Sequence, residues 1–434
     1  MEKKSILFVM PMLPYPLVSG GHQALYNGLV AIHDDMNVSL SFIVDDEYQY
    51  LDAVKDFVKE MPDVKLFPCY QCERIADIEK KTKRRPWYKK AFHAIFPIKH
   101  RHKSHPIHPI PFDKTAYWKL CTLPPSEDWI KHNQDIVDNN HFDFVQVEMP
   151  WLMNMVLGLS CEGKMIFVHH ELGFVRRALE MRDTPKDDYN SWMWLRFADM
   201  NEISLLNKYD AVVTLSSTDT EKLKEAGVVK PLYSSMATVE TCSSPEENLY
   251  TAKRLTFMGP DVHTPNYDGI MWFLENCWNQ LKDTDPDYTL DIIGRWREDN
   301  ILAIKSRYEG VNFLGYVDNL SDVMKGSIMI VPINIGSGIR MKILEASTRG
   351  IPFVSTSVGA EGIPVKDGIH CIIADKPEDF VRGILKLQDV SLQKQFVRQA
   401  RQMVKENFSL EALRANRLGI YKSIFNNSTS CTES

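Results

Sequence analysis

A segment between residues 336 and 346 combines glycines, two cations and one carboxylate in an order that suits a phosphorylated ligand. Its residues are Gly336, Ser337, Gly338, Ile339, Arg340, Met341, Lys342, Ile343, Leu344, Glu345 and Ala346. The apolar run 328–332 precedes it and predicts a buried strand, so the glycines occupy a strand-to-helix turn. Backbone N–H groups at a helix start attract phosphate oxygens. Arg340 and Lys342 add positive charge, and Glu345 can accept hydrogen bonds from sugar hydroxyls.

Two series of short apolar runs, alternating with helical patterns, predict the elements that position this segment. In the first half the runs are 6–10, 38–44, 144–147, 165–168 and 211–215. In the second half they are 255–258, 290–293, 328–331, 352–355 and 371–373. Such runs are typical of parallel strands covered by helices. We therefore expect two doubly wound α/β domains, at 1–240 and 253–408, joined by a polar, turn-rich connection.

The composition excludes several broad classes. A length of 434 residues predicts two domains, and 44% hydrophobic and 25% charged residues are ordinary for a soluble globular protein. The net charge of −6 gives no general case for nucleic-acid binding. Eight cysteines are too few for a disulfide scaffold and favour reduced thiols in the cytoplasm. The single CxxC at Cys69 and Cys72 lacks a second ligand pair for zinc, and no apolar run is long enough to span a membrane.

Two further motifs follow predicted strands of the first half. Gly20 and Gly21 come after the first strand and open a helical pattern, so a ligand could approach the backbone closely there. The spacing of a dinucleotide fingerprint is absent, which counts against a nicotinamide-dependent enzyme. His169, His170 and Glu171 end the strand at 165–168. A histidine in such a place is often structural, so neither histidine by itself establishes a catalytic role.

The segment 336–346 and its flanks resemble the donor-binding region of glycosyltransferase family 4, the retaining sugar-nucleotide transferases of GT-B fold. The motifs that carry the resemblance are Leu255-Thr256-Phe257-Met258-Gly259, Pro265-Asn266-Tyr267-Asp268-Gly269, Ile292-Ile293-Gly294, Val354-Ser355-Thr356 and Gly359-Ala360-Glu361-Gly362. They appear in the family's order and cover about 150 residues of the second half. The resemblance specifies neither the sugar nor the acceptor.

The resemblance implies a GT-B architecture, with two Rossmann-like domains facing each other across a cleft and a helix at 409–425 that packs back on the first domain. It implies that a nucleoside diphosphate sugar gives its sugar to a hydroxyl of a glycan or lipid-linked glycan. The residues implied to bind the donor are Gly20, Gly21, Gly338, Arg340, Lys342, Glu345 and Glu361. His170, Arg340 and Lys342 would act in the transfer. The two cations would stabilise the departing diphosphate, so no metal or other cofactor is expected.

The chain departs from the family pattern at two positions. Ser337 stands where the first carboxylate of a Glu-x7-Glu motif would fall, and Glu345 is the retained second member. Pro260 opens a segment where many members carry an arginine and a lysine. Two alternatives therefore stay open. One is a sugar-nucleotide epimerase of the same fold, and the other is a non-catalytic partner in glycan assembly.

A basic and aromatic segment from Lys80 to Pro111 interrupts the first domain. It holds ten Lys or Arg residues and no Asp or Glu, with aromatic residues interleaved. A solvated loop, an anionic membrane surface or lipid-linked acceptor, and nucleic acid are three interpretations of such a patch. We expect no nucleic acid partner. We predict that the segment docks a cytoplasmic enzyme on the inner face of the membrane or binds an acceptor phosphate.

Overall fold

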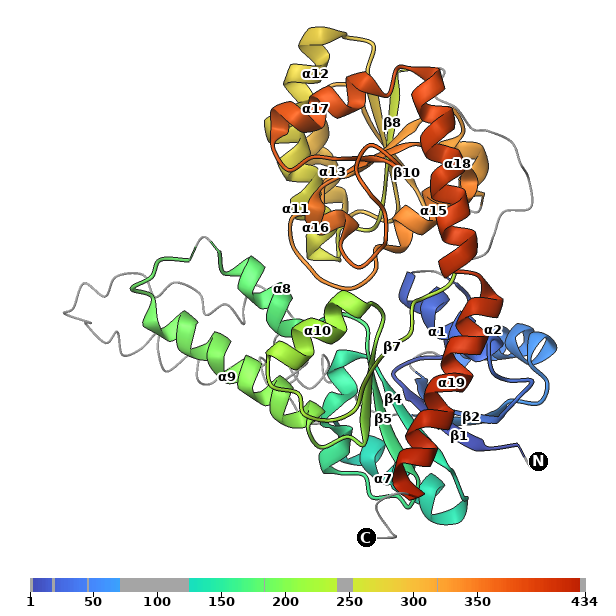
Figure 1. Cartoon of the computed structure of the whole chain (residues 1–434). Coiled ribbons are helices and arrows are strands. Elements are labelled where there is room, and N and C mark those ends of the chain that lie inside the picture. Colours follow the sequence, from blue (N-terminus) through green and yellow to red (C-terminus); the bar gives the residue numbers. More distant parts are fainter. Residues whose placement is uncertain are drawn as a thin grey trace, which may run out of the picture.

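The computed structural model describes residues 3–17, 20–44, 47–70, 125–182, 184–239, 253–317 and 319–429. Two parallel sheets, each covered by helices on both faces, lie one above the other in Figure 1. This arrangement confirms the predicted GT-B fold of two Rossmann-like domains. The segment from Lys80 to Pro111 lies outside the described residues.

The first sheet has seven strands in the order β3-β2-β1-β4-β5-β6-β7, and every neighbouring pair is parallel. Its strands are β1 (Ser5–Met10), β2 (Asn37–Val44), β3 (Lys65–Tyr70), β4 (Phe144–Glu148), β5 (Lys164–His169), β6 (Ala211–Thr214) and β7 (Leu232–Ser234). Its helices are α1 (Gly20–Val30), α2 (Glu47–Glu60), α7 (Glu127–Asn139), the 3₁₀ helix η1 (Pro150–Leu157), α8 (Gly173–Glu180), α9 (Tyr189–Leu206) and α10 (Ser217–Glu225).

The second sheet has six parallel strands in the order β10-β9-β8-β11-β12-β13. Its strands are β8 (Arg254–Met258), β9 (Thr289–Ile293), β10 (Val311–Gly315), β11 (Ile328–Val331), β12 (Phe353–Ser355) and β13 (Ile372–Ile373). Its helices are α11 (Thr264–Phe273), the π-helix η2 (Leu274–Trp278), α12 (Asn279–Thr284), α13 (Glu298–Lys305), α14 (Leu320–Met324), α15 (Met341–Arg349), α16 (Ser357–Ala360), α17 (Pro377–Lys386) and α18 (Val390–Asn407).

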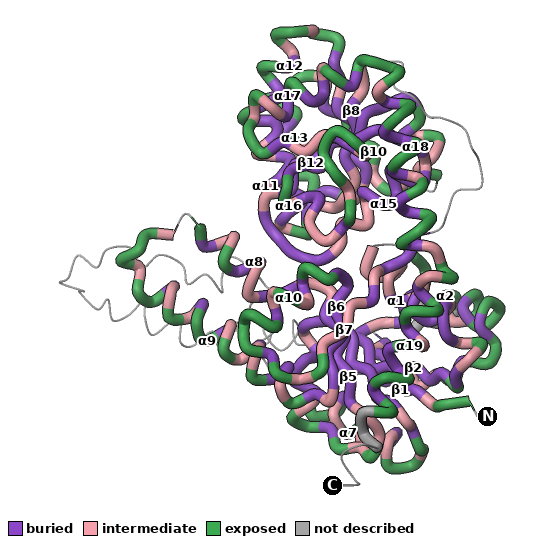
Figure 2. Tube along the Cα trace, viewed as in Figure 1, coloured by how far each residue is buried: buried purple, intermediate pink, exposed green. Residues whose placement is uncertain are grey.

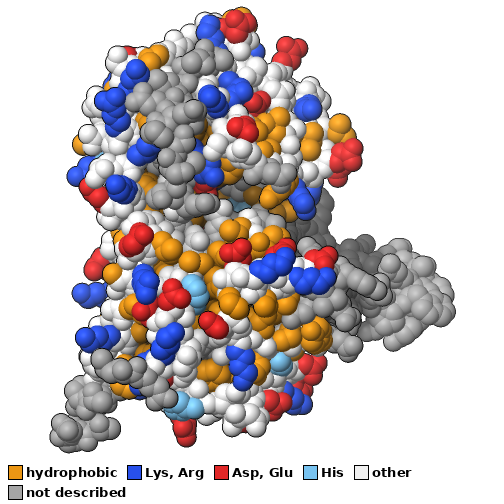
Figure 3. All heavy atoms as spheres, turned by 90° about the vertical axis from the view of Figure 1, so that its right-hand side faces the viewer, with side chains coloured by type: hydrophobic (Ala, Val, Ile, Leu, Met, Phe, Trp, Pro, Cys, Tyr) orange, Lys and Arg blue, Asp and Glu red, His pale blue; other side chains and the backbone are white. Residues whose placement is uncertain are grey.

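The core follows from the apolar runs, because strands covered on both faces bury consecutive residues. Figure 2 shows buried residues concentrated along the central strands of both sheets. The two faces of the first sheet belong to separate apolar clusters, and the second domain has one large cluster. On the face in Figure 3, cationic and anionic side chains are interspersed over both domains.

The last helix joins the two domains. In Figure 1, α19 (Leu410–Thr429) follows α18 of the second domain and runs down along the first sheet. Leu413, Ile420, Tyr421 and Ile424 are buried in the same cluster as the residues of β1 and β2. The Tyr421 ring lies 5.3 Å from the ring of Phe144 in β4, measured between centroids.

All ten predicted strands are present, and β3, β7 and β10 are additional. All three are edge strands, which have a neighbouring strand on one side only. In β10 the residues alternate between more and less exposed, and β7 has only three residues. Short or partly exposed strands lack the continuous apolar run that identified the others.

Candidate functional site

The carboxyl ends of both sheets point toward the boundary between the domains, where open α/β sheets bind ligands. From the first domain, this boundary receives the start of α1, the loop after β5 and the start of α10. From the second domain, it receives the loops after β8, β11 and β12. We call the first set the lower rim and the second set the upper rim.

The glycines of the upper rim adopt backbone conformations that other residues rarely reach. After β11 the chain turns through Gly336, with φ 120°, and Gly338, with φ 78°. A Cβ atom on Gly338 would stand inside van der Waals distance of the His170 carbonyl oxygen of the lower rim. Both the turn and the close approach of the domains therefore require glycine here. The helix α15 ends at Arg349, and the following Gly350, with a φ of 68°, forms its left-handed cap.

Arg340 immediately precedes α15 and so lies just outside the helix. Its Nη1 donates hydrogen bonds to the Ser337 and Gly338 carbonyl oxygens of its own loop. Its Nε and Nη2 atoms are buried and have no hydrogen-bond partner among the described residues. Burial lowers the pKa of the guanidinium, and the nearby Glu171 carboxylate opposes that shift. The loop thus holds a cation with unused donors.

Lys342 lies in the first turn of α15, also in a desolvated place. Its ammonium donates to Asn266 Oδ1 at 2.7 Å and stands 4.1 Å from the centroid of the Phe257 ring. Burial lowers the pKa of this ammonium well below its usual value, and the adjacent Arg340 charge adds to the shift. No ion pair with a carboxylate satisfies Lys342 within the described ranges. An anion between the two cations would relieve both costs.

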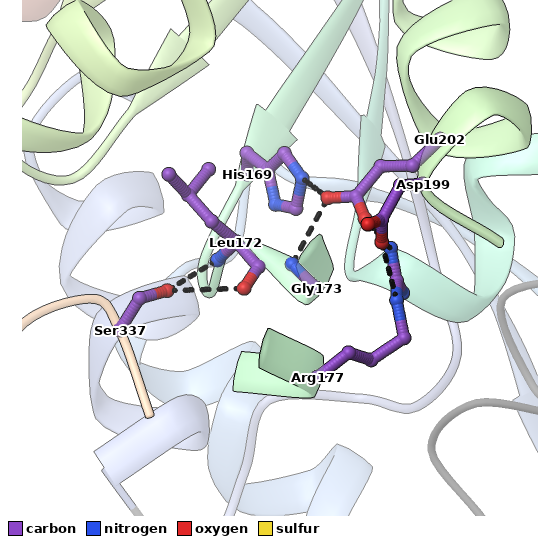
Figure 4. Close-up of polar contacts among 7 residues, drawn as sticks. All are labelled: His169, Leu172, Gly173, Arg177, Asp199, Glu202 and Ser337. Atoms are coloured by element: carbon purple, nitrogen blue, oxygen red, sulfur yellow. Dashed lines mark hydrogen bonds and ion pairs between the residues drawn. The ribbon is translucent and has the colours of Figure 1, made fainter. Parts of the chain in front are cut away.

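Ser337 forms the direct polar contact between the upper and lower rims shown in Figure 4. Its hydroxyl accepts a hydrogen bond from the Leu172 backbone N–H at 2.5 Å, and its oxygen is 3.4 Å from the Leu172 carbonyl oxygen. Ser337 is buried. The position that holds a carboxylate in the common family pattern therefore contacts the opposite domain in this chain.

A buried ion network supports the lower rim behind this contact (Figure 4). The His169 Nε2 atom lies 2.8 Å from Glu202 Oε1, which also accepts the Gly173 backbone N–H at 2.9 Å. Arg177 donates to Glu202 Oε2 at 2.5 Å and to Asp199 Oδ1 at 2.7 Å. Because Glu202 and Arg177 are on α9 and α8, the network fixes the start of α8 against α9.

His170, which the resemblance implied would act in the transfer, has a different partner from His169. Its Nε2 atom lies 2.6 Å from Glu148 Oε2 at the end of β4. The imidazole is 12% exposed, whereas the His169 side chain is fully buried. The neighbouring Glu171 carboxylate pairs with Arg176 at 3.1 Å and lies next to Gly336 of the upper rim.

The glycines at the start of α1 also lie at the boundary. Helix α1 begins at Gly20, and Gly21 is its second residue. A Cβ atom on Gly20 would stand 3.1 Å from Met341 Cγ at the start of α15. Gly20 therefore faces the segment that carries Arg340 and Lys342.

The two carboxylates predicted to bind the donor are both engaged in ion pairs. Glu345 is buried within α15, and its carboxylate accepts from Arg349 one turn later. Glu361 pairs with Lys222 of α10, across the domain boundary. Glu361 therefore links the two rims through its ion pair with Lys222. Glu345 lies on the same helix as Lys342, and its carboxylate is paired with Arg349.

The loop after β8 also contributes an acid, whose hydrogen-bond donors lie at the start of α13. Asp261 is buried and accepts hydrogen bonds from the Arg297 backbone N–H at 3.1 Å, Arg297 Nε at 3.0 Å and Asn300 Nδ2 at 2.6 Å. Within the described residues, no group of three or more His, Cys, Asp or Glu side chains is arranged to hold a metal.

Sequence reasoning missed the residues that form hydrogen bonds or ion pairs with the residues of the predicted motifs. They are Glu148, Lys222, Glu202 and Asn266. Asn266 lay within a recognised motif but carried no assigned role. The other three belong to strands and helices whose patterns indicate only secondary structure. Their roles depend on pairings across the fold, which spacing along the chain does not reveal.

Comparisons with known proteins agree with this geometry. Residues 252–389 match the family model for glycosyl transferases group 1. A Klebsiella pneumoniae protein described as an uncharacterised 44.6 kDa protein in the cps region is 24% identical over 289 residues, covering 63% of this chain and 73% of that protein.

Several solved structures share the whole fold. A mutant of S. aureus TarM in complex with fondaparinux, alpha-GlcNAc-glycerol and UDP is 13% identical, with a TM-score of 0.67, and covers 96% and 99% of the two chains. Anabaena HepE in complex with UDP is 12% identical, with a TM-score of 0.62 and coverage of 96% and 100%. The Thermosynechococcus elongatus sucrose-phosphate synthase is 11% identical, with a TM-score of 0.68 and coverage of 98% and 100%. The family match over the second domain and the GT-B fold together support a glycosyltransferase.

Proposed function

We propose that the protein is a retaining glycosyltransferase of family 4 type, which moves a sugar from a nucleoside diphosphate sugar to a hydroxyl of a glycan or lipid-linked glycan. The observation that carries the proposal is the pair of desolvated cations, Arg340 and Lys342, at the domain boundary. A diphosphate would supply an anion for Lys342 and acceptors for the Nε and Nη2 donors of Arg340 that lack partners among the described residues. The structures of HepE and TarM that contain UDP make UDP the first nucleotide to test.

In the proposed reaction, the upper rim binds the donor. Arg340 and Lys342 contact the diphosphate and stabilise the charge that develops on it as the sugar departs. Glu345 accepts hydrogen bonds from the ribose, and Gly20, Gly21 and Gly338 let the donor approach the backbone. Glu361, through Lys222, helps to close the two domains, which limits access of water to the donor.

The experiment is a turnover assay with a panel of nucleoside diphosphate sugars, with and without glycan acceptors. We expect release of the nucleoside diphosphate, which is faster with the correct acceptor, and a product that keeps the anomeric configuration of the donor. An inverted product would contradict the retaining assignment. Conversion of the donor without release would favour an epimerase. Binding without any turnover would favour a non-catalytic partner in glycan assembly.

Metal independence is part of the proposal. Because the protein supplies cations for the diphosphate, we expect activity to survive EDTA. Loss of activity on chelation, restored by magnesium or manganese, would contradict this charge balance.

The acceptor side of the proposal concerns polysaccharide assembly. The relative in a cps region supports a glycan acceptor of that kind. None of the described helices is long and apolar enough to cross a bilayer. The segment from Lys80 to Pro111 is proposed to dock on anionic lipid at the cytoplasmic face or to bind an acceptor phosphate. Such attraction weakens with salt, since the Debye length shrinks from about 10 Å at 0.1 M to about 3 Å at 1 M.

Sedimentation with anionic liposomes tests this docking. Replacing Arg84, Arg85, Lys89 and Lys90 by Ser should reduce sedimentation at low salt and leave donor binding unchanged. If wild-type protein does not sediment with such liposomes and the variant transfers sugar normally, the segment is a solvated loop.

A further inference from the structure

A chain of hydrogen bonds connects the His170 imidazole in the cleft with the C-terminal helix. The Tyr421 hydroxyl of α19 donates to Gln146 Oε1 at 2.7 Å. Gln146 Nε2 donates to Glu148 Oε1 at 2.5 Å, and the other carboxylate oxygen, Oε2, lies 2.6 Å from His170 Nε2. We call these four residues the Tyr421–His170 chain. It passes through β4, the central strand next to β1.

The alternation of β4 explains why the two middle members point the same way. Successive side chains of a strand point to opposite faces, so Gln146 and Glu148 share one face with Phe144. That face lies against α19, where the rings of Phe144 and Tyr421 pack. The valines at 145 and 147 belong to the apolar cluster on the opposite face. A glutamine and a glutamate are thus placed on the face of a central strand that otherwise buries apolar residues.

Burial makes these hydrogen bonds necessary. Gln146 is 0% exposed, Glu148 3% and Tyr421 4%. A buried carboxylate without partners would be strongly unfavourable, and here two donors satisfy it. Of the four members, the imidazole of His170 is the most accessible, at 12%. The Tyr421–His170 chain therefore connects the buried interior of the first domain with a partly exposed imidazole at the domain boundary.

The donor and acceptor roles can be assigned from the chemistry of the members. An ionised carboxylate only accepts, so His170 Nε2 carries the proton that it shares with Glu148. In the neutral imidazole, Nδ1 is then an acceptor with a lone pair. Burial raises the pKa of Tyr421 to about 12, so its hydroxyl remains a donor throughout the working pH range.

The backbone after Glu148 also has an unusual conformation. Met149 has a φ of 76°, and among the described residues it is the one non-glycine with a positive φ. Such a conformation is unfavourable and persists where the surrounding structure requires it. It ends β4 directly after the carboxylate that faces His170.

We propose that Glu148 is a positioning residue, which holds His170 in the Nε2–H tautomer so that Nδ1 accepts a hydrogen bond from a substrate hydroxyl. Gln146 and Tyr421 hold the Glu148 carboxylate in this orientation. This inference rests on the proposed glycosyl transfer. It differs from the role of His169, whose partner Glu202 also binds Gly173 and Arg177 and whose side chain is sealed from the cleft.

The first test changes the carboxylate in the full-length protein. In Glu148→Gln, the imidazole loses the charge that selects one tautomer, and we expect kcat to fall by roughly tenfold or more, as for other partners that orient a functional histidine. Binding of UDP, measured by calorimetry, should remain unchanged. Nitrogen-15 NMR of the imidazole should show the Nε2–H tautomer in the wild type and a mixture in Glu148→Gln, with His170→Asn used to assign the signal.

The second test removes only the far end of the chain. Tyr421→Phe keeps the ring in the core and deletes the hydroxyl that contacts Gln146 and the Arg417 side chain, so we expect a smaller fall in kcat in the same direction. The matched control is Tyr209→Phe, because the Tyr209 hydroxyl is also buried and donates to the Met153 carbonyl oxygen at 2.8 Å. The control should lose a similar amount of stability but should keep kcat and the His170 signal.

The possible results separate the two proposals. An unchanged His170 tautomer and wild-type kcat in Glu148→Gln would overturn the positioning role. So would an equal loss of kcat in Tyr421→Phe and Tyr209→Phe, which would indicate a general effect of destabilisation. If the wild type turns over no nucleoside diphosphate sugar, the proposed function fails, whereas the NMR comparison still decides whether Glu148 fixes the tautomer.

Discussion

The two rims of the domain boundary differ in whether the fold supplies partners for their charged groups. On the lower rim, the acids and histidines have partners within the fold, as in the pairs His169–Glu202 and His170–Glu148. On the upper rim, Arg340 has buried donors without partners among the described residues, and Lys342 is desolvated with only an amide oxygen as its hydrogen-bond partner.

This difference separates two requirements that a transferase must meet. A partly buried cation with unsatisfied donors is unfavourable, so we expect the upper rim to bind an anion. The lower rim is complete in the free protein, which fixes the orientation of its side chains before any substrate binds. In this account the upper rim supplies binding energy for the donor, and the lower rim supplies geometry. The following predictions separate the two.

The largest effect on stability should come from the lower rim. Glu202→Ala removes the carboxylate that satisfies His169 and Arg177, leaving a buried charge poorly paired. We expect a loss of about 3–5 kcal/mol in the free energy of unfolding, measured by urea denaturation. The control, Glu225→Ala, removes an exposed carboxylate of α10 and should change little. Equal stability of the two variants would contradict a structural role for the network.

The same variant gives a pH dependence with a definite sign. Burial raises the pKa of Glu202, but the hydrogen bond from His169 and the Arg177 charge outweigh it, so the net pKa lies below the usual 4.5. A depressed carboxyl pKa stabilises the folded state above the unfolded pKa, and that contribution is lost as pH falls through the folded pKa. The stability difference between wild type and Glu202→Ala should therefore be full at neutral pH and shrink below about pH 4.5.

Substitutions in the upper rim should weaken donor binding without lowering stability. Arg340→Ala should weaken binding of the nucleoside diphosphate by about 1.5–3 kcal/mol, roughly 10- to 150-fold, and lower turnover. The melting temperature without ligand should stay unchanged or rise, because a desolvated cation is removed. Arg307→Ala, at an exposed site in the same domain, serves as the control. Unaltered affinity in Arg340→Ala would exclude this arginine from the donor site.

A glycine tests how closely the rims must approach. Gly338→Ala places a Cβ against the His170 carbonyl oxygen in a left-handed conformation. The matched control is Gly368→Ala, since Gly368 has a similar φ of 69° with nothing within 4 Å of the added atom. Both should lose about 1–2 kcal/mol of stability from the backbone. Only Gly338→Ala should also reduce turnover, and a normal rate in it would show that the rims need not be this close.

A smaller effect is expected at Glu345. Glu345→Gln keeps the shape of the side chain but weakens its contacts with ribose hydroxyls, so donor affinity should fall by about 1 kcal/mol. Calorimetry with a nucleoside diphosphate measures this change, and circular dichroism checks that the fold is intact. The ribose role would be wrong if the affinity of the variant equalled that of the wild type.

The smallest effect should come from the ion pair between the rims. Glu361 and Lys222 are each more than a quarter exposed, at 28% and 26%, and exposed pairs contribute about 0.2–1 kcal/mol. Glu361→Gln should therefore raise KM slightly, and the difference from wild type should vanish at 1 M salt. A change of tenfold or more would assign Glu361 a direct contact with the donor instead.

The sequence predicted the central strands and the glycine turn because each has a local signal. Strands buried on both faces are continuous apolar runs, and Gly336 and Gly338 adopt dihedral angles that few other residues reach. The edge strands β3, β7 and β10 lacked that run. The Tyr421–His170 chain could not be predicted, because Tyr421 and Gln146 are 275 residues apart and meet only after α19 packs on the first sheet. Ser337 was recognised as unusual, but its contact with Leu172 depends on how the domains face each other.

The most direct test of the donor site compares UDP with UMP by calorimetry, using wild type and Lys342→Ala. If Lys342 contacts the diphosphate, wild type binds UDP more tightly than UMP, and the variant loses most of that preference while its affinity for UMP changes little. GDP with GMP and ADP with AMP extend the comparison to other nucleobases. If the variant retains the full preference for every diphosphate that the wild type binds, or the wild type prefers none of them, then Lys342 and its loop are not the donor-binding site.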